Sequence, residues 1–126
     1  MQQILSGSVL WCTRQEVLQR NRGADWTFHF SGMRPFHTNW GEIALTDKSV
    51  QITGTVNLAI QFADLTQLYL GFDDAYTPML ARNFGLFWKP LRLTLLDDSQ
   101  VYLIIDYKFF GSSNAGWFAK LKEVLS

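Results

Sequence analysis

The sequence has few of the residues that mark secreted, disordered or metal-stabilised chains. Its one cysteine, Cys12, cannot form an internal disulfide, and a structural zinc site needs about four ligands. Charged residues make up 17% of the chain, below the roughly 25% of an average domain. Intrinsic disorder is therefore not expected, because disordered chains are highly charged and poor in apolar residues.

Net charge and long apolar runs are also missing. The 11 basic and 11 acidic residues give a net charge of zero, so no global positive field attracts nucleic acid, which is not an expected partner. No run of about 20 apolar residues is present to span a bilayer. The segment before Cys12 lacks the basic start and apolar core of a signal peptide. We therefore expect a cytoplasmic protein with a buried or half-buried thiol at Cys12.

Apolar and aromatic residues are what the chain has in quantity. Of its 126 residues, 48% are hydrophobic and 15% aromatic, so we expect a single domain over residues 1–126 with a heavily aromatic core. A net charge near zero gives little repulsion between copies of this chain, and its many apolar residues must be buried in some contact. A homo-oligomer is therefore a further expectation.

Alternating apolar and polar residues predict about seven strands. Within the predicted hairpin around Asp47 and Lys48, the side chains of Ile43, Leu45, Val50 and Ile52 should point inward, and Gly71 is the expected position of a bulge. The predicted strands cover residues 25–31, 42–46, 50–53, 56–62, 68–72, 91–95 and 101–105.

The register of the last predicted hairpin follows from the number of residues in its loop. An odd loop puts the inward residues of 91–95 on the same face as the inward residues of 101–105 and Tyr107, whereas an even loop mixes apolar and polar side chains. We therefore predict an odd loop. The odd loop also allows Arg92 to lie opposite Asp106, as an exposed ion pair worth less than about 1 kcal/mol.

Two helices are expected. Thr13 and Glu16 have the spacing of a capping box, which predicts a short helix over residues 14–21. A second, C-terminal helix should be capped by Ser113 or Asn114 and carry an apolar stripe made of Trp117, Leu121, Val124 and Leu125. The predicted fold class is mainly β (α+β), a sandwich or partly open barrel of about seven antiparallel strands closed by this amphipathic helix.

Several short motifs follow one another along the chain: Gly41–Lys48 (GEIALTDK), Ile60–Leu65 (IQFADL), Pro90–Leu95, Gln100–Leu103 and the helix with Trp117, Leu121 and Leu125. Taken in this order, they resemble the GRAM and bacterial pleckstrin-homology-like domains. The resemblance covers about residues 15–125. It implies a pleckstrin-homology-like barrel that serves as a protein-interaction or membrane-targeting module.

The residues that could carry chemistry have simpler interpretations. His29 and His37 lack enough partner ligands for a metal site. The Asp73–Asp74 and Asp97–Asp98 pairs are typical of turns, where aspartate bonds the local backbone. No nucleophile elbow, phosphate loop or triad pattern occurs. We therefore predict no catalytic residues, no metal, no cofactor and no enzyme activity.

The segment from Arg82 to Lys89 is the candidate contact surface. Its aromatic residues Phe84, Phe87 and Trp88 lie between the two basic residues. Exposed, this segment would enter a lipid interface or fill a pocket of a partner. Alternatively, its aromatic residues belong to the core.

Three functions stay open at this point. The leading expectation is a small non-enzymatic module that binds a protein or peptide, with a free sheet edge accepting an extended segment beside the C-terminal helix. The alternatives are membrane-surface binding through residues 82–89 and a barrel-like pocket for a small apolar ligand.

Overall fold

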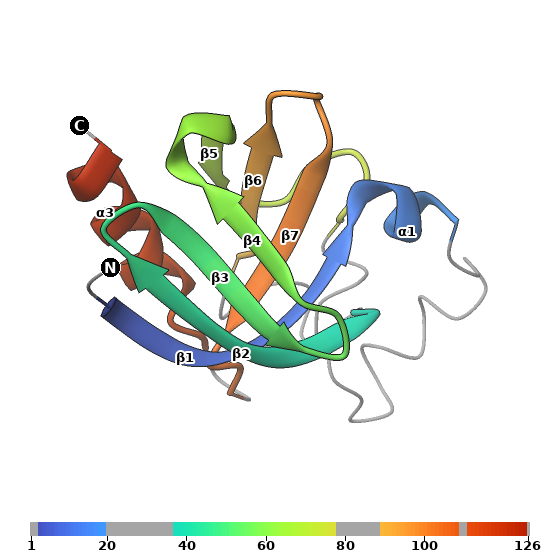
Figure 1. The fold of residues 1–126 in the computed structure, drawn as a ribbon. Coiled ribbons are helices and arrows are strands. Elements are labelled where there is room, and N and C mark those ends of the chain that lie inside the picture. The colour runs from blue at the N-terminus through green and yellow to red at the C-terminus, as the bar shows by residue number, and fades with distance from the viewer. Residues whose placement is uncertain (1–2, 20–36, 78–88, 109–110, 126) are drawn as a thin grey trace.

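The computed structural model describes residues 3–19, 37–77, 89–108 and 111–125. They form one seven-stranded antiparallel sheet with two α-helices and a short 3₁₀ turn (Figure 1). The elements are β1 (Gln3–Thr13), α1 (Arg14–Leu18), β2 (Asn39–Thr46), β3 (Ser49–Gly54), β4 (Leu58–Gln61), η2 (Phe62–Asp64), β5 (Leu65–Leu70), β6 (Leu91–Leu95), β7 (Gln100–Ile105) and α3 (Asn114–Leu125).

The strand order across the sheet is β4-β3-β2-β1-β7-β6-β5. The long strand β1 lies in the centre and pairs with β2 on one side and β7 on the other. The sheet curls into a half-barrel, with α3 packed against β5, β6 and β7 (Figure 1). This architecture confirms the predicted fold class and is consistent with a pleckstrin-homology-like open barrel. It leaves β4 and β5 as the two edge strands.

The central strand β1 is the element that the sequence pattern missed. Its residues Val9, Leu10, Trp11 and Cys12 are all buried in succession. Alternation disappears here because both faces of the sheet are covered, and a continuous apolar run does not identify a strand by periodicity. The predicted strand over residues 25–31 lies outside the described residues.

The β2–β3 hairpin confirms the prediction that Ile43, Leu45, Val50 and Ile52 point inward, since each is at most 1% exposed. Strand β4 is shorter than the predicted 56–62, because it begins at Leu58 after a bend and ends at Gln61, where the chain enters the 3₁₀ turn. The register irregularity of β5 lies between Leu65 and Gln67, so the prediction of a bulge at Gly71 was wrong.

The β6–β7 hairpin has the predicted odd loop. Leu91 pairs with Leu103 and Leu93 with Val101, all on the inner face. Three residues, 96–98, connect the last bonded pair, in which the N–H of Leu95 donates to the carbonyl of Ser99.

Two predictions about this hairpin were wrong. Arg92 pairs with Tyr102 rather than Asp106. Strand β7 ends at Ile105, and the backbone of Asp106 turns to a positive φ of 51°. This turn puts Tyr107 against the outer apolar cluster rather than the inner one.

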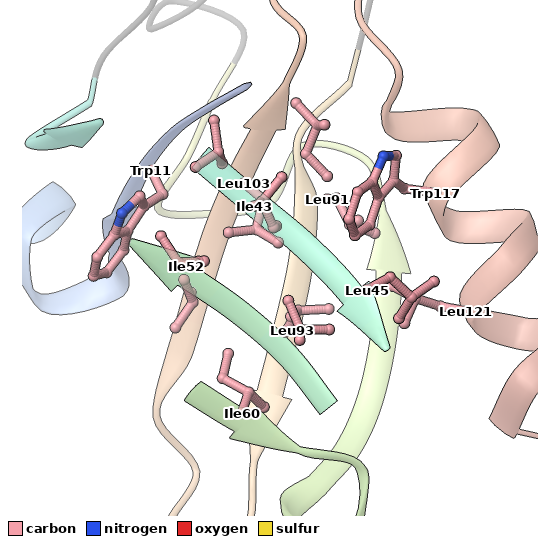
Figure 2. Close-up of a cluster of buried hydrophobic side chains, with 14 residues drawn as sticks. Trp11, Ile43, Leu45, Ile52, Ile60, Leu91, Leu93, Leu103, Trp117 and Leu121 are labelled. Carbon is pink, nitrogen blue, oxygen red and sulfur yellow. The ribbon is translucent and has the colours of Figure 1, made fainter. Parts of the chain in front are cut away.

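The inner face of the half-barrel holds one continuous apolar cluster (Figure 2). Trp117 and Leu121 of α3 lie at one end of this cluster, and Trp11 lies at the other. Between them the buried residues are aliphatic, from Ile43 on β2 to Leu103 on β7. Among the described residues, this inner cluster is therefore mainly aliphatic, with Trp11 and Trp117 as its buried aromatic side chains.

A second buried cluster covers the outer face of β1 and β7. It consists of Leu10, Cys12, Val17, Ala75, Tyr76, Tyr102 and Ile104. Val17 comes from α1, and Ala75 and Tyr76 come from the segment that follows β5. Cys12 is fully buried here, as predicted. This part of the sheet thus has two buried faces.

The helix ends agree only in part with the prediction. The capping box at Thr13 and Glu16 is present, although α1 ends at Leu18. At the start of α3 the hydroxyl of Ser112 accepts the N–H of Asn114. Ser113 and Asn114, the predicted caps, bond elsewhere, and Asn114 is 1% exposed.

Candidate functional site

The predicted contact segment falls largely outside the described residues. Arg82, Phe84, Phe87 and Trp88 lie outside them, so both interpretations of this segment, an exposed contact surface or part of the core, stay predictions. Lys89 is described: its side chain is exposed, and its carbonyl accepts a hydrogen bond of 2.7 Å from Nδ2 of Asn114. Lys89 therefore lies beside the start of α3.

The histidines and aspartates do not assemble a metal site in the part of the chain that the structure describes. His29 lies outside it, and the rings of His37 and Trp40 are nearly perpendicular, with their centroids 6.3 Å apart. Asp97 accepts the N–H and the hydroxyl of Ser99, which confirms its role as a turn residue.

Asp73 is the centre of a charged cluster on the outer face of β5, β6 and β7. Its carboxylate accepts the backbone N–H groups of Ala75 and Tyr76, as expected of a turn residue. It also accepts hydrogen bonds of 2.9 Å from Arg92 and 2.7 Å from the hydroxyl of Tyr102. The side chain is 9% exposed, so this is a nearly buried ion pair.

Arg14 and Asp74 form the outer part of the same cluster. The guanidinium of Arg14, at the start of α1, binds both carboxylate oxygens of Asp74 at 3.0 and 2.8 Å. Arg14 also lies 3.9 Å from the Asp73 carboxylate. The cluster thus ties α1 and the segment after β5 to the outer face of the sheet.

Hydrogen bonds set the ionisation of this cluster. Burial raises the pKa of the Asp73 carboxyl, but the hydrogen bonds from Tyr102, Arg92 and two backbone N–H groups outweigh it and hold that pKa below its ordinary value. Burial, together with the Asp73 carboxylate, raises the pKa of Tyr102. Asp73 is therefore charged and Tyr102 neutral at physiological pH.

Arg92 links this cluster to the edge strand β5. Its second guanidinium nitrogen donates to Gln67 at 2.9 Å, and the guanidinium carbon lies 4.5 Å from the centre of the Tyr69 ring. The Tyr69 hydroxyl donates to the carbonyl of Phe72. Arg92 thus fixes the positions of Gln67 and Tyr69, the side chains on the outer face of β5.

The free edge of β5 follows from its pairing with β6. The N–H of Gly71 donates to the carbonyl of Pro90, so alternate residues back along β5, including Tyr69, also turn their backbone groups towards β6. Leu68 and Leu70 therefore turn theirs away from the sheet. Among the described residues, no backbone hydrogen bond reaches these outward groups.

Two of the usual protections against strand pairing, charge and proline, are missing from this edge, and its register irregularity lies at one end, between Leu65 and Gln67. Natural edge strands carry charges, prolines or bulges, or lie under a covering element. Strand β5 (LTQLYL) has neither a charged residue nor a proline. Its inner side packs against α3, and Tyr69 and Leu96 beside it are 39% and 64% exposed. This edge is the candidate functional site.

Comparison with models of known protein families finds no match, and a search of curated proteins finds no similar sequence. The assignment of a function therefore depends on the residues and the geometry of this chain. Neither of the described helices is long and apolar enough to cross a membrane.

Sequence reasoning anticipated a free sheet edge beside the C-terminal helix but did not identify the strand. The signal that could have found β5 is the shortage of charge: only Asp64 is charged between Ser49 and Phe72. Nothing in the spacing of Arg14, Asp73 and Arg92 indicated that they would meet.

Proposed function

We propose that this chain is a non-enzymatic module that binds an extended peptide segment of a partner protein along the free edge of β5. The observation that carries the proposal is the uncharged edge at Leu68 and Leu70, which no other described strand pairs with. Strand addition at such an edge derives affinity from main-chain hydrogen bonds and specificity from alternate side chains. In this proposal the protein works in the cytoplasm, where its single cysteine would stay reduced.

The surroundings of β5 support this function. The helix α3 packs beside the strand and gives an added strand a second surface to contact. On the outer side, Arg92 holds Gln67 and Tyr69 in place. A site fixed before binding loses less conformational entropy when the ligand arrives.

The other two candidate functions gain no comparable support. The membrane hypothesis depends on residues 82–89, of which only Lys89 is described. A pocket for an apolar ligand would need open space inside the half-barrel, where the described side chains form a continuous buried cluster. The relation to GRAM and pleckstrin-homology-like domains remains part of the proposal, supported by the strand order.

A random-peptide display library, selected on the purified protein, tests the proposal. We expect enriched peptides with alternating apolar residues and no charge in the paired stretch. When such a peptide binds, hydrogen exchange of the Leu68 and Leu70 amides should slow. Failure to enrich any peptide, or binding without protection of these amides, would refute the proposal.

Three variants locate the bound strand. Leu68→Pro removes an outward N–H and should weaken peptide binding at least about tenfold, since each lost hydrogen bond is worth about 0.5–1.5 kcal/mol and the ring hinders pairing. Leu68→Ala removes the side chain but keeps the N–H, so it should retain most of the affinity. Ala59→Pro makes the matched change on the other edge strand, β4, and should leave binding intact.

A further inference from the structure

The second edge strand, β4, also has no pairing partner on its outer side among the described strands. The N–H of Phe62 donates to the carbonyl of Lys48, and Ile60 pairs with Val50 on the β3 side. Alternation therefore turns the backbone groups of Ala59 and Gln61 away from the sheet. Within the described chain no backbone hydrogen bond meets them, and both side chains are exposed.

The sequence of this edge is complementary to itself. Leu58, Ile60 and Phe62 alternate with Ala59 and Gln61, so the pattern is the same about Ile60 in either direction. An antiparallel pair with its two-fold axis at Ile60 sets Ala59 opposite Gln61 of the second copy, and each such pair exchanges two main-chain hydrogen bonds. The same axis sets Leu58 opposite Phe62 of the second copy. These two residues are half-buried and pack against the inner core.

The charge distribution around β4 also favours pairing with a second copy of the chain. No residue from Ser49 to Ala63 is charged, so self-pairing brings no like charges opposite one another, which would oppose association. The net charge of zero adds no repulsion between copies. We infer that a second copy of this chain is the partner of β4, in a two-fold symmetric dimer that continues the sheet from one half-barrel into the other.

The size of the contact sets the strength of the dimer. A four-residue strand buries far less than the roughly 1,200–2,000 Å² of a stable interface. We therefore expect a weak dimer with a dissociation constant of about 0.1–1 mM. This inference is independent of peptide binding, because the two processes use opposite edges of the sheet.

Sedimentation velocity from about 10 µM to 1 mM tests the dimer at the concentrations expected for this contact. The sedimentation coefficient of the wild type should rise with concentration, and Ala59→Pro should abolish the rise. Leu68→Pro, on the other edge, should leave the rise unchanged. A constant coefficient for the wild type, or association that persists in Ala59→Pro, would overturn the inference.

A disulfide trap tests the register and does not depend on the proline variant. In the proposed pair the Cα atoms of Ala59 and Gln61 of the second copy lie about 5.5 Å apart, which suits a disulfide, whereas Ala59 and its own counterpart lie diagonally at about 7–8 Å. A mixture of Ala59→Cys and Gln61→Cys chains, oxidised with glutathione disulfide, should cross-link far faster than either chain alone. Equal rates would refute this register. The native Cys12 is fully buried and does not compete.

Discussion

Replacing Asp73 with alanine is the sharpest test of the charged cluster. The substitution removes the anion that holds Arg92 and the Tyr102 hydroxyl, and it leaves the guanidinium of Arg92 nearly buried, with 14% of its side chain exposed. Breaking a buried ion pair from one side costs about 3–5 kcal/mol. Gln67 still binds Arg92 in the variant, so we expect a loss near the lower end, about 3 kcal/mol.

Urea unfolding followed by the fluorescence of the five tryptophans measures this loss. With a slope of about 2 kcal/mol per molar urea, the midpoint should fall by about 1.5 M. Asp74→Ala is the matched control. Asp74 binds Arg14 through both oxygens but is 77% exposed, so its removal should change the midpoint little. Equal midpoints for the two variants would refute the argument that burial makes Asp73 the stronger anchor.

The pH dependence of the same difference gives an independent check. The pKa of Asp73 is lower in the folded chain than its ordinary value of 3.8. A carboxyl of this kind stabilises the fold above its unfolded pKa, and the contribution is lost as the pH falls towards the folded pKa. The gap in stability between wild type and Asp73→Ala should therefore be constant from pH 7 to about pH 5 and shrink below pH 4. A gap that grows in acid would contradict the assignment.

Two further substitutions test the start of α3 and the β2–β3 pair. Asn114 accepts the N–H of Ile105 and donates to the carbonyls of Leu103 and Lys89. Asn114→Ala should therefore lower the free energy of unfolding by about 3 kcal/mol and lower the melting temperature measured by circular dichroism. An unchanged melting temperature would contradict this role. A Cβ at Gly41 would overlap the carbonyl of Thr53 and lie 2.9 Å from Cα of Gly54, so Gly41→Ala should strongly destabilise the sheet. As a control, a Cβ at Gly116 in α3 would meet nothing within 4 Å, so Gly116→Ala should stabilise the fold slightly. Similar unfolding midpoints for the two variants would argue against the steric explanation.

The parts of the fold that were predictable are those in which a single strand pair determines the pattern. The β2–β3 hairpin alternates cleanly because its inner face is buried and its outer face is open to solvent. The β6–β7 register followed from loop parity, since a slip of one residue would turn Leu91 and Leu93 outward. In both cases the information is local in the sequence.

The parts that were missed depend on distant contacts. Strand β1 shows no alternation because the segment around Tyr76, more than sixty residues later, covers its outer face. Arg14 reaches Asp74 across 60 residues and Tyr102 across 88. Asp73 has the residue type and position of an ordinary turn aspartate, and only the folded sheet brings Arg92 to it.

The two edges of the half-barrel differ in how firmly they are held, and this difference fits the two proposed partners. Strand β5 is braced by α3 on the inner side and by Arg92 on the outer side. A foreign peptide must pay the full ordering cost of its own chain, so it gains most from an edge that is already fixed. Strand β4 is shorter and has no such brace among the described residues. A second copy of the chain presents a strand that is already folded. Pairing at β4 therefore costs less conformational entropy than binding a flexible peptide, and a weakly held edge is sufficient for it.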